Sequence, residues 1–347
     1  MKILHIAAHL GDGAGKAIGG MARLDAAAGN ENKILLLQEP QKLNHVENCR
    51  AASVEVLPAN AADAAIAWAD VVILNWWGSP VMDGFLRRFP KVPCRVLLWS
   101  HKNGFYDPPL PNALVSTCDG LLATSPLTLT RWPEATLVYG FGDFAPEQIA
   151  PKTDYSLHNG EFVIGYVGTP SYKKLPPDTV DYFRAVLEVI PNARFVLAGE
   201  SSEEFRSDVE RAGLSEHVDI PGWTEDVYGL LRSFDVFGYL LRRDTFATTE
   251  NSVLEAMAAG LPIVMSREPV GRYVLGECNG MLFQTPREYA DLTKKLFLDV
   301  NLREKMGRAA RTYAQTRYNK ADNQKRFQNA CADMLEKEKH LCFVRNI

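Results

Sequence analysis

Short runs of apolar residues recur along the chain, separated by longer segments in which apolar positions repeat every three or four residues. Most of the short runs are continuously apolar, which is typical of strands buried on both faces of a parallel sheet. In the first half, the predicted strands are residues 2–7, 33–37, 54–57, 71–75, 95–100, 120–124 and 136–139. In the second half, they are residues 162–167, 194–198, 218–220, 236–240, 262–265 and 280–283.

Amphipathic helices are predicted between these strands. Residues 179–190 and 225–234 each keep their apolar side chains on one helical face, with Asp178 and Thr224 as the expected N-caps. The C-terminal part of the chain is predicted to be helical, with Asn301 as a cap. Repeated strand–helix–strand order favours a doubly wound α/β architecture.

The length of 347 residues predicts two domains, because single cores stop growing at about 250–300 residues. Residues 144–160 are polar, contain two prolines and lack a sustained period, which favours a linker. We therefore expect a first Rossmann-like domain over 1–148, a linker over 149–160 and a second Rossmann-like domain over 161–325. A helical segment over 326–347 is expected to pack back on the first domain. Two such domains would face a central cleft between the carboxyl ends of their strands.

Composition and charge exclude several classes of protein. A content of 46% hydrophobic and 23% charged residues excludes a disordered or collagen-like chain. The net charge of −4 argues against nucleic acid as a partner. The six cysteines form no C-x-x-C pair, so we expect no metal site and a reduced, cytoplasmic protein. We find neither a signal peptide nor an apolar span of about 18 residues, and peripheral membrane association stays open.

Two glycine-rich turns follow predicted strands. The first contains Gly13 and Gly15, and it departs from a Walker A loop because Ala17 stands where Ser or Thr would hold magnesium. Its backbone N–H groups could approach an anion or a sugar, or it is simply a strand-to-helix turn. The second turn begins at Gly168, and Lys174 downstream would reach a phosphate or remain solvated.

Residues 248–262 are the most informative stretch. Polar residues, including Asn251 and Ser252, lead into a short predicted helix that Gly260 ends. A helix N-terminus offers N–H donors and a positive dipole end, which suits a diphosphate. Glu255 lies about one turn in, where it would accept hydrogen bonds from vicinal hydroxyls or merely complement the dipole.

Aromatic residues follow two neighbouring predicted strands. Trp76 and Trp77 come after one strand, and His101, Phe105 and Tyr106 come after the next. Both segments are expected on the carboxyl rim of the sheet, where flat rings can stack on an acceptor. The alternative is that some of these rings belong to the core.

The stretch from Glu255 to Val264, Glu-Ala-Met-Ala-Ala-Gly-Leu-Pro-Ile-Val, resembles the signature of the retaining GT-B glycosyltransferases of group 1. The glycine turn after the first strand, His101, Gly168 with Lys174, and the Gly222-Trp223 pair resemble further features of that family. Together, these matches extend over nearly the whole chain.

The resemblance implies a role for each matched residue. Glu255 would bind the nucleotide ribose, Lys174 the donor diphosphate, and Gly222 with Trp223 the base. Gly13 and Gly15 would approach the diphosphate and the acceptor. His101 would lie near the anomeric carbon and the donor sugar, and Asn251 and Ser252 would present the helix start.

This chain departs from the family pattern at two charged positions. Thr169 stands where the family usually has an arginine, so one phosphate contact is missing. Ala247 stands eight residues before Glu255, where the family has a glutamate that grips the sugar. Glu250 is the preferred substitute and Asp244 the other option, so His101 and Glu250 are the expected catalytic residues.

The implied reaction moves a sugar, with a hexose expected, from a nucleotide diphosphate donor to an acceptor hydroxyl with retention. The acceptor would be a sugar, a lipid-linked molecule or another small molecule. We expect no cofactor beyond the nucleotide sugar and no metal, since the sequence has no D-x-D triplet. Three alternatives stay open: a non-catalytic nucleotide-sugar or glycan-binding relative, a nucleotide-sugar epimerase and, with least support, a dehydrogenase.

Overall fold

The computed structural model describes residues 1–40, 43–157, 160–276 and 280–343. The chain forms two compact units. Unit 1 consists of Met1–Phe144 together with Lys320–Ile347, and unit 2 consists of Ala145–Asn319. Among the described helices, none is both long enough and apolar enough to span a bilayer.

Unit 1 is built on a parallel sheet with the strand order β3-β2-β1-β4-β5-β6-β7. Its strands are β1 (Lys2–Ala7), β2 (Glu31–Leu36), β3 (Glu55–Pro58), β4 (Val71–Trp76), β5 (Val96–Ser100), β6 (Gly120–Ala123) and β7 (Thr136–Leu137). Its helices are α1 (Asp12–Ala27), α2 (Asn44–Ala51), η1 (Ala59–Ala61), α3 (Ala62–Trp68), α4 (Pro80–Leu86), α5 (Asn112–Thr117), α6 (Pro126–Leu129) and α14 (Lys320–Leu335).

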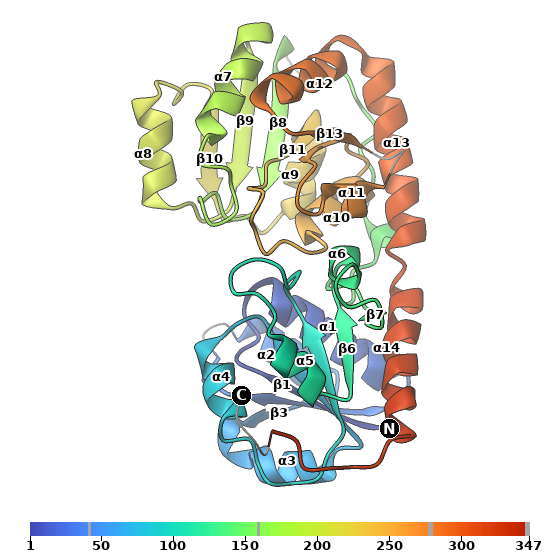
Figure 1. Cartoon of the computed structure of the whole chain (residues 1–347). Helices are drawn as coiled ribbons and strands as arrows, with labels where there is room; N and C mark the ends of the chain where they lie inside the picture. Colours follow the sequence, from blue (N-terminus) through green and yellow to red (C-terminus); the bar gives the residue numbers. More distant parts are fainter. Residues whose placement is uncertain (41–42, 158–159, 277–279, 344–347) are drawn as a thin grey trace. The chain divides into compact units, whose positions relative to one another are not determined.

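Alternate residues of these strands face opposite sides of the sheet, and helices bury both sides. Leu4, Val72 and Leu98 point to the face that α3, α4 and α5 cover. The last helix, α14, covers the other face (Figure 1). Ile3 and Ile73 point to that face and pack with Phe327 and Met334 of α14. The C-terminal helix is thus part of the unit that the N-terminus begins.

Unit 2 repeats the doubly wound plan with the strand order β10-β9-β8-β11-β12-β13, again parallel. Its strands are β8 (Phe162–Val167), β9 (Ala193–Ala198), β10 (Val218–Gly222), β11 (Val236–Tyr239), β12 (Ile263–Ser266) and β13 (Met281–Phe283). Its helices are η2 (Pro146–Gln148), α7 (Thr179–Val189), α8 (Glu203–Arg211), α9 (Val227–Ser233), α10 (Asn251–Ala258), α11 (Gly271–Leu275), α12 (Pro286–Leu298) and α13 (Val300–Arg317). Helices α7 and α12 pack together, as do α10 and α13 (Figure 1).

Within the segment expected as a linker, residues 149–160, Lys152 and Tyr155 form hydrogen bonds to other parts of unit 2. The backbone N–H of Lys152 donates to Ala259 O at 2.7 Å, and the Tyr155 hydroxyl donates to Gly260 O at 2.7 Å. The buried guanidinium of Arg303 donates to Tyr155 O at 2.7 and 3.1 Å. These bonds satisfy backbone groups that a free linker would leave to water.

Two helix starts differ from the sequence prediction. Helix α9 begins after Asp226, whose carboxylate accepts from Gly229 N at 2.7 Å, so the predicted cap Thr224 lies outside the helix. Helix α13 begins after Asp299, which accepts from Leu302 N at 2.9 Å, so Asn301 lies within the helix. In both cases, a carboxylate satisfies one of the free N–H groups of the first turn.

Candidate functional site

Each sheet has one point where the strand order reverses. This point falls between β1 and β4 in unit 1 and between β8 and β11 in unit 2. In open α/β sheets, ligands bind outside the carboxyl ends of the strands at such a switch point. The carboxyl edge of each sheet is therefore the expected place for a ligand in its own unit.

Glycines shape the carboxyl edge of the unit 2 sheet. Gly168, which follows β8, donates its N–H to Ala198 O at 2.9 Å, and Gly199 donates to Gly222 O at 2.7 Å. Gly199 has φ +136°, and a Cβ there would lie 1.8 Å from Gly168 O. The edge thus depends on a close backbone approach that glycine alone permits without displacement.

An ion pair lies beside this edge. The Lys174 ammonium donates to a carboxylate oxygen of Glu250 at 2.9 Å, and the Tyr239 hydroxyl donates to the same oxygen at 2.5 Å. The other oxygen of Glu250 accepts from Thr248 N at 3.2 Å. Glu250 is buried, with its side chain 5% exposed, while that of Lys174 is 29% exposed. The loop after β8, the end of β11 and the start of α10 therefore meet at one carboxylate.

The pair keeps both of its members charged. Burial alone would raise the pKa of Glu250, but the Lys174 charge and the hydrogen bonds from Tyr239, Lys174 and Thr248 N lower it overall. Burial alone would lower the pKa of Lys174, but the Glu250 charge raises it. The predicted catalytic residue Glu250 thus lies against the predicted diphosphate lysine.

Helix α10 starts directly after Glu250, which has the left-handed φ of +53° and is its N-cap. Asn251 and Ser252 form the first positions of the helix, as the sequence predicted. Glu255 lies one turn further and is half-buried. Burial, with a smaller contribution from the nearby Glu255 charge, raises the pKa of Tyr228 on α9 to about 12. The first turn of α10 and the Glu255 side chain are therefore positioned by one rigid element.

The remaining unit 2 candidates lie on the loops that follow β8 and β10. Thr169, directly after Gly168, is exposed. Trp223, next to Gly222, has 70% of its surface exposed, which is unusual for so large an apolar side chain. A solvated indole ring beside the carboxyl edge is available to stack on a flat ligand.

In unit 1, the glycine turn of the sequence analysis is the first turn of helix α1. Gly13 and Gly15 both lie inside the helix, and Gly15 donates its N–H to Gly11 O at 3.1 Å. A Cβ at Gly15 would lie 2.1 Å from Leu10 O, whereas one at Gly13 would meet open space. The flexible turn was thus a wrong prediction, and what the edge offers is a helix N-terminus without a side-chain cap.

His101 is held in one tautomer. Its Nε2 lies 3.0 Å from Asn75 Oδ1, and the Asn75 amide nitrogen donates to Ile6 O at 3.1 Å. Since the amide nitrogen is committed as a donor, Oδ1 accepts, and Nε2 of His101 carries the proton. Burial, with a smaller contribution from His5, lowers the pKa of His101 to about 3, so the ring is neutral at pH 7.

The predicted acceptor aromatics divide into two groups. Trp76 is 2% exposed and lies in the hydrophobic core, so its ring is not available to an acceptor and that assignment is corrected. Trp77 is half-buried between His9 and His101, at ring-centroid distances of 5.2 and 6.1 Å. Phe105 and Tyr106 are also half-buried.

Sequence reasoning missed Tyr239, Tyr166 and Arg242. Tyr239 holds Glu250 and stacks on Tyr166 of β8 at a ring-centroid distance of 5.1 Å. The Arg242 guanidinium donates to Tyr172 O at 2.9 Å and to both carboxylate oxygens of Asp244. The position of these residues at or just after strand ends was a signal for their place in the site, but their contacts depend on tertiary packing.

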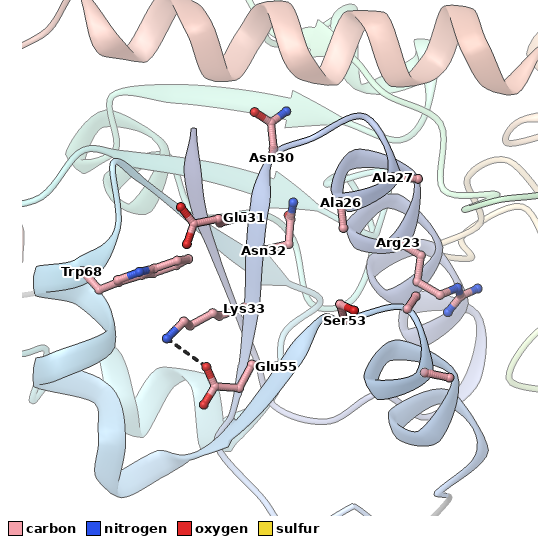
Figure 2. Close-up of a pocket in the computed structure, with 12 residues that line it drawn as sticks. Arg23, Ala26, Ala27, Asn30, Glu31, Asn32, Lys33, Ser53, Glu55 and Trp68 are labelled. Atoms are coloured by element: carbon pink, nitrogen blue, oxygen red, sulfur yellow. Dashed lines mark ion pairs between the residues drawn. The ribbon is translucent and has the colours of Figure 1, made fainter.

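The two units have cavities at opposite ends of their sheets. A cavity of about 510 Å³ in unit 2 is lined by residues after the ends of β11, β12 and β13, including Arg242, Asp244 and Arg267. A cavity of about 730 Å³ in unit 1 lies at the amino ends of β2 and β3, where Lys33 pairs with Glu55 beside Trp68 (Figure 2). The second cavity contains none of the predicted site residues, and it lies at the end of the sheet opposite to the usual ligand edge.

Comparison with known proteins shows similarity to glycosyltransferases. Residues 151–313 match the model of the family described as glycosyl transferases group 1. The matched residues cover most of unit 2. EpsD of Bacillus subtilis, described as a candidate glycosyltransferase, is 26% identical over 174 residues. Those residues are 48% of this chain and 45% of EpsD, so the matched part spans less than half of that relative.

Solved structures extend the likeness to both units. HepE from Anabaena, in complex with UDP and glucose, has a TM-score of 0.73 at 14% identity and covers 96% of this chain and 100% of its own. A glycosyltransferase from Rickettsia africae has a TM-score of 0.71 at 13% identity, with 97% and 99% covered. Sucrose-phosphate synthase from Thermosynechococcus elongatus has a TM-score of 0.68 at 17% identity, with 96% and 99% covered. The fold is therefore GT-B, and the predicted resemblance to GT-B glycosyltransferases is confirmed.

Proposed function

We propose that this protein is a retaining glycosyltransferase that transfers a sugar from a nucleotide diphosphate donor to an acceptor hydroxyl. The observation that carries the proposal is the group at the switch point of unit 2: Lys174, the first turn of α10 and Glu255 lie on elements that meet at one carboxyl edge. The UDP complex of HepE supports a uridine nucleotide as the donor to test first.

Each part of a nucleotide sugar has a proposed partner in unit 2. The diphosphate would lie against the N-terminus of α10, where the N–H groups of Asn251 and Ser252 and the helix dipole favour negative charge. Glu255 would accept hydrogen bonds from the ribose hydroxyls, and Trp223 would stack on the base. Gly168 and Thr169, directly after β8, would let the backbone approach the phosphates.

Lys174 must serve the diphosphate while it is paired with Glu250. An ammonium has three donors, and the pair uses one of them at 2.9 Å. Lys174 can therefore hold Glu250 and a phosphate oxygen together, with Glu250 turned toward the sugar. The missing arginine at Thr169 leaves this lysine to supply the local positive charge in a chain whose net charge is −4.

Retention would follow from attack on the same face that the leaving group departs from. The acceptor oxygen would bond to the anomeric carbon, the bond from that carbon to the diphosphate oxygen would break, and the acceptor proton would pass to the leaving diphosphate. Lys174 and the α10 N–H groups would stabilise the charge that develops on that oxygen. We propose that this stabilisation needs no metal ion.

In unit 1, the neutral His101 would orient the transferred sugar by hydrogen bonding and would not act as a cation. Trp77, Phe105 and Tyr106 would contact the acceptor, which is a sugar, a lipid-linked molecule or another small molecule. Gly13 and Gly15, in the first turn of α1, would present N–H groups toward the phosphates or the acceptor.

A thermal-shift panel with uridine, guanosine and adenosine diphosphate sugars tests the donor, because a ligand that binds only the folded state raises the melting temperature. Glu255→Ala is expected to weaken the affinity for the best ligand about 10- to 100-fold, the usual loss for a charged hydrogen bond. Glu203→Ala is the matched control, because it removes a glutamate from the first turn of α8, and it should leave the affinity for the same ligand unchanged. Unchanged affinity in Glu255→Ala would refute the assignment of the ribose site.

A non-catalytic nucleotide-sugar-binding protein is the second candidate. Thr169 and Ala247 replace two charged residues of the family pattern, and Ala247 is buried at 1% exposure, so it offers no group to a sugar. Incubation with the best ligand separates the two functions. Transfer to an acceptor or hydrolysis supports the enzyme, whereas saturable binding without turnover supports the binding protein.

A further inference from the structure

The fold brings three metal-ligating side chains together at the amino end of the unit 1 sheet, and a fourth, Cys94, lies beside one of them. Asp119, His340 and Cys342 each place one ligand atom within 4.8 Å of those of the other two. Cys94 Sγ lies 3.9 Å from Cys342 Sγ. No local motif signals this group, because two of its members lie just before strands β5 and β6 and the other two follow α14, with no C-x-x-C spacing.

The backbone fixes these residues in place. Cys94 and His340 form an antiparallel bridge, in which Cys94 N donates to His340 O at 2.9 Å and His340 N donates to Cys94 O at 3.1 Å. Asp119 precedes β6, and its Oδ2 accepts from Val96 N at 2.7 Å. That bond orients the carboxylate and leaves Oδ1 directed at His340 Nε2, 3.0 Å away.

Two of the spacings in this group are close to those around a tetrahedral metal. A zinc ion with bonds of about 2.3 Å to sulfur and about 2.0 Å to nitrogen separates two sulfurs by about 3.8 Å, and a sulfur from a nitrogen by about 3.5 Å. Here the sulfur–sulfur distance is 3.9 Å, and Cys342 Sγ lies 3.7 and 3.8 Å from the two ring nitrogens of His340. Sulfur, imidazole and carboxylate ligands together favour zinc over magnesium or calcium.

Burial and charge support the same interpretation. Cys94 and Cys342 are buried at 1% and 4% exposure, while His340 is exposed and would open a path for the ion. Two thiolates and one carboxylate around a divalent cation carry a net charge of −1. Lys337 donates to Asp119 O, and Arg95 donates to Lys337 O at 2.6 Å, so basic side chains lie beside that charge.

We propose that Cys94, Asp119, His340 and Cys342 form a structural zinc site that fastens the C-terminal segment to the unit 1 sheet. The site lies at the amino ends of β5 and β6, whereas the proposed acceptor residues follow the carboxyl ends of the strands. It is therefore independent of the proposed reaction. The segment after α14 would be fastened by metal bonds in addition to its backbone bridge.

The test uses the full chain, purified with reductant and zinc and then dialysed. We expect one zinc per chain by elemental analysis. In the cobalt-substituted protein we expect the intense visible bands of tetrahedral Co²⁺ and a near-ultraviolet band from thiolate ligands. Cys342→Ser and His340→Gln should each lower the zinc affinity by more than about tenfold. His340 is exposed, so His340→Gln tests the site in a protein that folds.

Cys49→Ser is the matched control, because it removes a thiol that contacts Gly19 and Arg23 elsewhere in unit 1. It should bind zinc as the unmodified chain does. Less than about 0.1 zinc per chain in the unmodified protein would overturn the proposal. Two other results would overturn it as well. The first is a Cys94–Cys342 disulfide whose reduction yields a protein that still binds no zinc. The second is a cobalt spectrum that is the same in Cys342→Ser as in the unmodified chain.

Discussion

The Lys174–Glu250 pair gives the sharpest test of how unit 2 holds its candidate site. The perturbations are Glu250→Ala, Lys174→Met and the double variant. Glu250→Ala leaves the Lys174 ammonium and the Tyr239 hydroxyl without this acceptor. Lys174→Met leaves a buried carboxylate with two remaining donors, Tyr239 and Thr248 N.

The two single variants should differ because the partners are unequally buried. Removing one partner of a buried pair costs about 3–5 kcal/mol, since it leaves an uncompensated charge. Glu250 is 5% exposed, so Lys174→Met should cost about 3 kcal/mol or more. Lys174 is 29% exposed and regains water, so Glu250→Ala should cost about 2 kcal/mol. The double variant should cost less than the sum, with a coupling of about 1–3 kcal/mol.

Urea titrations of the full chain at several pH values provide the assay. The folded state lowers the pKa of Glu250 below its ordinary 4.5, so its contribution to stability is present above that value and is lost as pH falls through the folded pKa. The destabilisation by Lys174→Met should therefore shrink in acid. A coupling below about 0.5 kcal/mol, or a Glu250→Ala variant clearly less stable than Lys174→Met, would refute the reasoning.

Three further variants test other parts of the structure. Gly199→Ala should destabilise the chain by more than about 2 kcal/mol in urea, because its Cβ would lie 1.8 Å from a carbonyl oxygen, whereas Gly84→Ala on α4 meets open space and should be neutral or stabilising. Arg303→Met should cost about 3 kcal/mol, because it leaves buried carbonyl oxygens without their donor, while the exposed Arg308→Met should cost under about 0.5 kcal/mol by thermal unfolding. Trp223→Ala should leave stability unchanged but weaken uridine diphosphate binding at least about fivefold by calorimetry, and unchanged binding would remove Trp223 from the proposed base site.

The pattern of apolar runs along the sequence predicted most of the fold. Residues 2–7 and 162–167 were predicted as strands at the bounds the structure has, and the other strands differ by a few residues at their ends. A continuous apolar run is a local signal, because a strand buried on both faces must be apolar throughout. Helix starts at Asp226 and Asp299 were missed because several polar residues precede each helix, and only the hydrogen bond selects the cap.

Site residues that follow the ends of predicted strands or begin a predicted helix could be predicted from the sequence. Contacts that depend on tertiary packing could not. Glu255 and the start of α10 were found from the run that ends in Gly260, and this run encodes a helix directly. The core position of Trp76 and the contact of Tyr239 with Glu250 were not predictable, since neighbours across the sheet decide them. The zinc ligands are the extreme case, because Cys94 and Cys342 are 248 residues apart.

Two unfavourable features coincide at Glu250, and this coincidence bears on its role. A left-handed φ of +53° is unfavourable by about 1 kcal/mol for a residue with a side chain, and burying a carboxylate is unfavourable until donors compensate it. A glycine at the helix start would remove both problems, and the fold does not need the carboxylate to begin α10, because the side chain does not cap the helix. The Glu250 carboxylate instead accepts from Lys174, on the loop after β8. The persistence of so unfavourable a residue supports the proposal that its carboxylate orients Lys174 and meets the hydroxyls of a bound sugar.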